Sequence, residues 1–221
     1  MISMIACVSR NQGIGYQGDL IVKSAKDMKR FTAKTKNKNI VMGYGTWKSL
    51  PTEVLPNRYN HILTHEITRE MRDLEKKYEE LGGNTKVKFH HLFPETQDTI
   101  IEHFSNYKDE VLIIGGQSLY ELFIPHAEKM YITYVHADLQ ADRYFPYFDT
   151  KKWNIIEERH VKDRIDFQAR KVEMIFYTFH RSKPSKGSMA LYPKDLDIIE
   201  TIKNKTENLL KARSFGNPLY Q

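Results

Sequence analysis

Apolar stretches that end in glycine and then enter a helix-like segment recur through the first half of the chain. Residues 39–43 and 111–115 are of this kind, each a run of branched and long aliphatic side chains closed by Gly43 or Gly115. Strands that alternate with helices favour a largely parallel sheet with helices on both faces. Two later strands, at residues 153–161 and 171–180, are spaced tightly enough for an antiparallel hairpin that finishes the sheet. The predicted fold class is therefore α/β.

Several strands of this sheet are predicted to end at residues suited to ligand binding. Cys7, Gly43, Thr64 and Gly115 lie at or close to the carboxyl ends of strands. Ligands bind at such ends, near a topological switch point, and glycine beside a helix start lets a phosphate approach the backbone. The pair Gly115-Gly116 lacks the third glycine of the dinucleotide fingerprint, so a purely structural turn fits it about as well. The convergence of the four ends predicts one cleft.

One carboxylate, Asp27, lies in the first turn of a helix predicted to begin near Ser24. Helical spacing places Asp27, Phe31 and Thr35 on one face. Ser24 and Asp27 also match a capping box, in which the acid reaches back to the helix start, and this local reading is the stronger one by itself. The surroundings reverse it, because residues 1–8 form an apolar strand and residues 13–18 a glycine-hinged loop. A buried acid there needs a partner, and we expect a ligand to be that partner.

The composition limits which kinds of ligand or partner the chain is expected to bind. The net charge is +6 and the sequence pI about 9.1, but the lysines are spread along the chain. We therefore rank an anionic cofactor and substrate above nucleic acid. Cys7 is the single cysteine, which suits a reducing cytoplasm and excludes a zinc-finger type of metal site. No apolar run reaches membrane-spanning length, and residues 1–8 lack the basic flank of a signal peptide.

Two segments stand apart from the alternating pattern. Residues 67–83, within an insertion at about 66–86, are predicted to form a packed surface helix whose apolar stripe is Ile67, Met71, Leu74, Tyr78 and Leu81. Residues 182–187 read as a polar hinge, and residues 194–213 as a weakly amphipathic helix. This predicts a catalytic domain over 1–181 and an extension over 182–221. The extension would clasp the domain, form a homodimer or dock a protein partner.

A series of short motifs, in this order, resembles dihydrofolate reductase over most of residues 1–180. The motifs are Ile5-Ala6-Cys7, Gly13-Ile14-Gly15, Asp27 with Phe31 and Thr35, Val41-Met42-Gly43 with Thr46-Trp47, Leu55-Pro56-x-Arg58, Ile114-Gly115-Gly116-x-x-x-Tyr120, Thr133 and Asp142-x-x-Phe145-Pro146. No single motif decides, but all of them in sequence make coincidence a poor explanation. The resemblance implies an enzyme that reduces dihydrofolate to tetrahydrofolate by hydride transfer from NADPH, in support of one-carbon and thymidylate metabolism.

The resemblance also implies roles for individual residues. Asp27 would accept hydrogen bonds from the pterin, oriented by Thr133, and Tyr120 would lie beside the nicotinamide. Arg58 would hold the tail carboxylate of the substrate with its planar fork. The remaining substrate contacts would be Ile5, Cys7, Met28, Phe31, Leu50, Leu55 and Ile114. The cofactor contacts would be Cys7, Ile14, Gly15, Leu20, Gly43, Gly45, Thr46, Thr64, His65, Gly115, Gly116, Gln117, Ser118, Leu119 and Tyr120.

The chain departs from the family pattern at two places near the site. Ile21-Val22 stands where a proline-tryptophan pair is usual, which affects a water near Asp27 and thus proton delivery. Tyr44 and Ser118 replace arginines that would hold the ribose phosphate of NADPH, so Thr64, His65 or a lysine would have to compensate. Two alternatives remain open: a related pterin or pyrimidine-precursor reductase, and a non-catalytic binding or structural module on the same fold.

Overall fold

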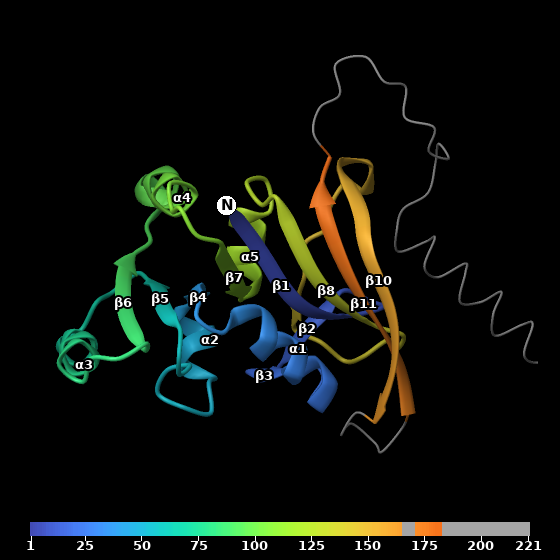
Figure 1. Ribbon diagram of the computed structural model, residues 1–221, viewed down its shortest axis with the longest axis horizontal. Helices are drawn as coiled ribbons and strands as arrows, with labels where there is room; N and C mark the ends of the chain where they lie inside the picture. Colours follow the sequence, from blue (N-terminus) through green and yellow to red (C-terminus); the bar gives the residue numbers. More distant parts are fainter. Residues whose placement is uncertain (165–170, 183–221) are drawn as a thin grey trace, which may run out of the picture.

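The computed structural model describes residues 1–164 and 171–182, and its centre is an eight-stranded sheet (Figure 1). The strand order is β10-β11-β8-β1-β7-β4-β5-β6. The bounds are β1 Ile2–Ser9, β4 Asn39–Gly43, β5 Tyr59–Thr64, β6 Lys86–His91, β7 Val111–Gly115, β8 Lys129–Val135, β10 Trp153–Arg164 and β11 Lys171–Arg181. The pairs from β8 through β1 to β6 are parallel, and β11 joins β8 and β10 antiparallel. The predicted α/β class, with its final hairpin, is confirmed.

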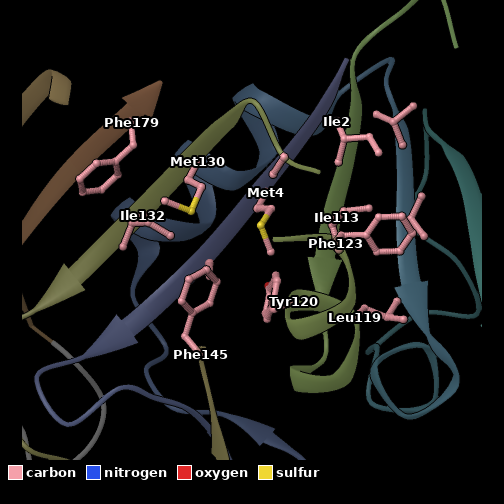
Figure 2. Packing of buried hydrophobic residues seen from close by; sticks show 14 of the residues in the cluster. Ile2, Met4, Ile113, Leu119, Tyr120, Phe123, Met130, Ile132, Phe145 and Phe179 are labelled. Carbon is pink, nitrogen blue, oxygen red and sulfur yellow. The ribbon is translucent and has the colours of Figure 1, made fainter. Parts of the chain in front are cut away.

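The helices cover both faces of this sheet. Their bounds are α1 Ala25–Thr35, α2 Tyr44–Lys48, α3 Arg69–Glu80, α4 Gln97–Ser105 and α5 Gln117–Phe123, with short 3₁₀ turns η1 at Pro94–Thr96 and η2 at Thr150–Lys152. Side chains alternate along each strand. On β1, Ile2 and Met4 belong to one buried cluster with Phe123 of α5 (Figure 2), whereas Ile5 belongs to a second cluster with Met71 of α3. The two clusters are the two faces of one sheet.

The sequence predicts a loop for the glycine-rich stretch after β1, but the structure has two short strands there. Strands β2 (Gly13–Tyr16) and β3 (Asp19–Leu20) pair with β9 (Arg143–Tyr144) in a small second sheet. Gly13 permits this close approach, because a Cβ there would lie 2.6 Å from the Cβ of Ala141. The pairing places residues 14–20 beside the carboxyl end of β1.

The insertion packs as a surface helix, as predicted, but its apolar stripe is shorter than the sequence indicated. Met71 and Leu74 are buried beside Phe89 of β6, whereas Leu81 is 68% exposed. Leu81 is at the C-cap of α3 and is followed by Gly82 and Gly83 with positive φ, so the chain turns away before that side chain can pack. The predicted hinge at 182–187, apart from Ser182, and the predicted helix at 194–213 lie outside the described residues. Within those residues, no helix is long and apolar enough to cross a membrane.

A histidine pair, His61 buried and His90 half-buried, joins β5 to β6 at the far side of the sheet. His61 Nδ1 lies 3.0 Å from His90 Nε2, and His61 Nε2 lies 3.1 Å from the side-chain oxygen of Asn39. Burial, followed by the nearby histidines, lowers the pKa of His61 to about 3. Burial, again with a neighbouring histidine, lowers the pKa of His90 to about 4. Both rings are therefore neutral in the folded protein at neutral pH.

Acid should destabilise the protein through this pair. Below an unfolded-state pKa of about 6.5 the unfolded chain takes up protons that the folded pair refuses, so the free energy of unfolding falls as pH falls. The slope is about 1.4 kcal/mol per pH unit for each histidine at its steepest. Denaturant unfolding at pH 7.5 and 5.5 measures it. His61→Gln should flatten the slope and exposed His126→Gln should not; equal slopes in all three proteins would contradict this account.

Candidate functional site

A cavity of about 1030 Å³ opens at the carboxyl ends of the central strands. The four strand-end residues singled out from the sequence, Cys7, Gly43, Thr64 and Gly115, all line it. So does every residue expected to contact a cofactor, which adds Ile14, Gly15, Leu20, Gly45, Thr46, His65, Gly116, Gln117, Ser118, Leu119 and Tyr120. The predicted cleft therefore exists, and its volume is at the upper end of the range for small-molecule and cofactor sites.

Glycines shape the wall of the cavity between β7 and α5. The Gly115-Gly116 peptide bond is cis, and Gly115 has φ of +122°. A Cβ on Gly115 would lie 3.3 Å from the hydroxyl of Tyr120, and one on Gly116 would lie 3.2 Å from Oγ1 of Thr46. That Tyr120 hydroxyl donates to the backbone carbonyl of Ile5 over 2.7 Å. Burial raises the pKa of Tyr120 far above its ordinary value, so the hydroxyl stays protonated and holds α5 against β1.

Gly115→Ala should therefore disturb both the backbone and the cavity. An L side chain at this φ costs about 1–3 kcal/mol, and the added methyl group presses on the Tyr120 hydroxyl. We expect a lower melting temperature and weaker binding of any ligand in the cavity. Thermal unfolding and ligand titration measure the two effects. Gly82→Ala, at another positive-φ glycine but far from the cavity, should lower stability alone, and equal loss of ligand binding in both variants would contradict the assignment.

Asp27 lies beside the cavity and not among its lining residues. Ser24 caps α1 by accepting from the backbone N–H of Asp27 over 3.1 Å. The acid that completes the helix start is Asp163 of β10, which accepts from the Ser24 hydroxyl at 2.6 Å and from the Lys26 N–H at 3.2 Å. The sequence could not reveal this partner. The Asp27 side chain itself is half-buried, and the Thr133 hydroxyl is close enough to lower the pKa of its carboxyl.

Several effects act on the pKa of the Asp27 carboxyl in opposite directions. Burial raises the pKa of the carboxyl above its ordinary value, while the Thr133 hydrogen bond and the charge of Arg30 lower it. Arg30 is itself 8% exposed and lies on the same helix. The sequence analysis overlooked Arg30, because an arginine within a basic helical run reads as a solvated side chain.

The remaining predicted substrate contacts gather on the second face of the sheet. Ile5, Phe31, Leu50, Leu55 and Ile114 share one apolar cluster. Ile114 and Cys7 also line the large cavity, whereas Ile5, Phe31, Leu50 and Leu55 do not. Met28 is 43% exposed and lies outside the cluster, so the structure does not place it with the other predicted substrate contacts.

Arg58 is buried, although a lone arginine in a turn is usually solvated. Its Nε donates to Oγ1 of Thr35 over 3.0 Å, and its guanidinium carbon lies 6.0 Å from the centre of the Phe31 ring. Nη1 donates to the carbonyl of Pro56. These contacts fix the plane of the guanidinium beside the apolar cluster. They also place it against the face of α1 that carries Asp27, Phe31 and Thr35.

The two departures noted in the sequence also have places in the structure. Ile21 and Val22 pack in a small cluster with Val135 and Met174, so this segment is held by apolar contacts. Tyr44 and Ser118 line the cavity. No lysine is among the cavity-lining residues in the described part of the chain, which leaves Thr64 and His65 of the groups expected to compensate for the missing arginines.

Comparison with known proteins agrees with this geometry. A family model described as "Dihydrofolate reductase" matches residues 1–181. The dihydrofolate reductase of Buchnera aphidicola subsp. Baizongia pistaciae (strain Bp) is 32% identical over 160 residues, which cover 72% of this chain and 86% of that protein. The Bacillus subtilis (strain 168) protein of the same name is 30% identical over 164 residues, 74% of this chain and 86% of its own.

A solved structure shares the fold. The dihydrofolate reductase from Enterococcus faecalis, described as complexed with NADP(H) and RAB-propyl, superposes with a TM-score of 0.63. The match covers 83% of this chain and 97% of that one at 23% sequence identity. At that identity the likeness concerns the fold alone.

Proposed function

The chain belongs to the dihydrofolate reductase family, and we propose that its cavity and the adjoining Asp27 carry out the reaction of that family. The enzyme reduces 7,8-dihydrofolate to 5,6,7,8-tetrahydrofolate, with NADPH as the reductant, and so supports one-carbon and thymidylate metabolism. The observation that carries the site assignment is a half-buried carboxylate, on a helix that Ser24 and Asp163 cap in its place, next to a cavity of about 1030 Å³.

The substrate side of the site is assigned to the face that bears Asp27. An ionised carboxylate offers only acceptors, which match the amino group and adjacent ring nitrogen of a pterin. The Thr133 hydroxyl orients this carboxylate. Phe31 with its neighbours in the apolar cluster packs the rings, and Arg58 binds the tail carboxylate. Charge and shape at this face thus fit a folate better than a pterin without a tail.

The cavity fits the cofactor in two respects. A Cβ on Gly45 would meet no protein atom within 4 Å, so the backbone there borders open space. The starts of α2 and α5 have glycine at the N-cap and no side-chain cap, which leaves backbone N–H groups for phosphate oxygens. When bound, NADPH supplies the hydride. The residues assigned to hold it are those that line this cavity, from Cys7 and Ile14 to Tyr120.

The protein's part in the chemistry is alignment, electrostatics and exclusion of water. The Asp27 carboxylate holds the pterin and favours its protonated form, in which the imine carbon accepts a hydride more readily. The Tyr120 hydroxyl, fixed on the Ile5 carbonyl, sets the wall against which the reacting rings align. Residues 14–20 form the rim that shields the reacting groups from water. The proton reaches the ring nitrogen through water instead of directly from the carboxyl.

An absorbance assay with NADPH and dihydrofolate tests this assignment. Faster turnover with dihydrofolate than with a tail-less dihydropterin of equal concentration, and none with a pyrimidine precursor, is the expected result. Comparison of NADPH with NADH in ligand titration shows how well Tyr44, Ser118, Thr64 and His65 serve the ribose phosphate. Binding of both ligands without turnover would favour a non-catalytic module instead.

We assign the protein to the cytoplasm, and the single cysteine of the chain supports this because a reducing compartment keeps it free. The contact of residues 194–213 with a second copy or another protein lies outside the described residues and stays a prediction from the sequence. Removal of residues 183–221, followed by measurement of oligomeric state and thermal stability, tests it.

A further inference from the structure

The buried Arg30 has a fixed position between the helix that carries Asp27 and strand β11. It follows Asp27 by three residues on α1 and is 8% exposed. Its Nη2 donates to the backbone carbonyl of Tyr177 over 2.6 Å, and its guanidinium carbon lies 4.7 Å from the centre of the Phe176 ring. Both contacts are with β11, so the guanidinium cannot swing freely toward the cavity. Because burial of a charge costs free energy, we expect a cation held in this way to have a specific role.

The third contact of this guanidinium is with the residue that serves Asp27. Nη1 donates to Oγ1 of Thr133 over 3.2 Å. Arginine has only donors, whereas a threonine hydroxyl has one proton and two acceptor positions. The hydroxyl must therefore accept from Arg30, and its single proton can be donated to the carboxylate of Asp27, whose pKa the Thr133 hydroxyl lowers. The direction of the Thr133 hydrogen bond is determined by Arg30.

We propose that Arg30 is a positioning residue of the dihydrofolate site: it keeps the Thr133 hydroxyl as a donor to Asp27 and leaves the other acceptor positions of that carboxylate for the pterin. The inference rests on the proposed function. No ion pair within 4 Å joins Arg30 to Asp27 in the residues that the structure describes. A direct pair would occupy the carboxylate that the substrate needs, whereas contact through a hydroxyl does not.

Other ionisable groups lie around Asp27 and Arg30 and contribute to the pH dependence of the site. Burial, followed by the charge of Asp27, raises the pKa of Cys7 in β1 and of Tyr120 in α5. Glu157 and Arg159 of β10, Tyr131 of β8 and Asp27 itself act on Arg30, whose pKa is lowered chiefly by burial. Arg159 offers a matched control, because its guanidinium carbon lies 5.0 Å from the centre of the same Phe176 ring and its side chain is exposed.

Three variants test the proposal in the full-length enzyme. Arg30→Met removes the donor and the charge but keeps apolar volume, and should weaken dihydrofolate binding by about tenfold, the scale of one hydrogen bond to a charged group. It should also move the pH dependence of hydride transfer to higher pH, because Asp27 loses a neighbouring cation and an oriented donor. Arg30→Lys should restore part of both effects. Arg159→Gln should leave both at the wild-type values.

A measurement without turnover separates this inference from the proposed function. Carbon-13 NMR of the Asp27 carboxyl in the ligand-free protein should show titration at higher pH in Arg30→Met, and a smaller effect of that substitution in a Thr133→Val background. Equal effects in both backgrounds, or an unchanged titration, would overturn the role given to Arg30. If Arg30→Met does not fold, Arg30→Lys decides: its Asp27 signal must titrate between those of the wild type and Thr133→Val. Absence of dihydrofolate turnover by the wild type would contradict only the proposed function.

Discussion

Asp27→Asn should lower the rate of hydride transfer to dihydrofolate by about 100- to 1000-fold, the loss typical when a group that stabilises transition-state charge is removed. The substitution keeps the size of the side chain. It replaces a charged acceptor by an amide, whose NH₂ group opposes a donor on the pterin and whose neutrality no longer favours the protonated ring. Ser24 still caps α1 through the backbone N–H of residue 27, so the helix should remain in place.

Single-turnover measurement with NADPH in excess reports this step directly. The deficit should shrink as pH falls, because more dihydrofolate then enters the site already protonated. Asp98→Asn is the matched control, since Asp98 also lies in the first turn of a helix, α4, but on the outside of the protein. Full turnover by Asp27→Asn at neutral pH would show that another group holds the pterin.

The central architecture could be predicted from sequence because buried parallel strands are continuous apolar runs and glycine marks their ends. Strands β4 and β7 occupy the predicted residues, 39–43 and 111–115. The glycine-rich stretch at 13–18 differed from the predicted loop because its strand character depends on pairing with β9, which lies far along the chain. The residues of this stretch and its neighbours in the sequence do not indicate that β9 is its partner.

The same distinction separates the predicted site residues from the overlooked ones. Four residues that line the cavity, Cys7, Gly43, Thr64 and Gly115, were predictable because they end strands that meet at one edge of the sheet, whereas the others were implied by the family resemblance. Arg30 and Asp163 were not, because each acts across a contact between α1 and the C-terminal hairpin. A lone charge in a helix or strand reads as solvated until the tertiary structure covers it.

Arg58→Lys should raise the KM for dihydrofolate by about 10- to 100-fold with little change in kcat, the cost of one or two hydrogen bonds to a charged group. In the native protein Thr35 and Pro56 engage two of the guanidinium nitrogens and fix its plane. A lysine ammonium is a point charge without that fork, so it cannot both bond to Thr35 and present two parallel donors to a carboxylate. The reacting rings would still align, because Asp27 and Phe31 are unchanged.

Steady-state kinetics with dihydrofolate and with a tail-less dihydropterin separate binding of the tail from a general disturbance. The variant should lose efficiency with dihydrofolate alone, because the tail-less substrate never contacts residue 58. Arg69→Lys on the exposed face of α3 controls for the loss of a guanidinium as such. Equal losses with both substrates would place Arg58 in the packing of α1 through Thr35, and the carboxylate of the substrate would then have to be held elsewhere.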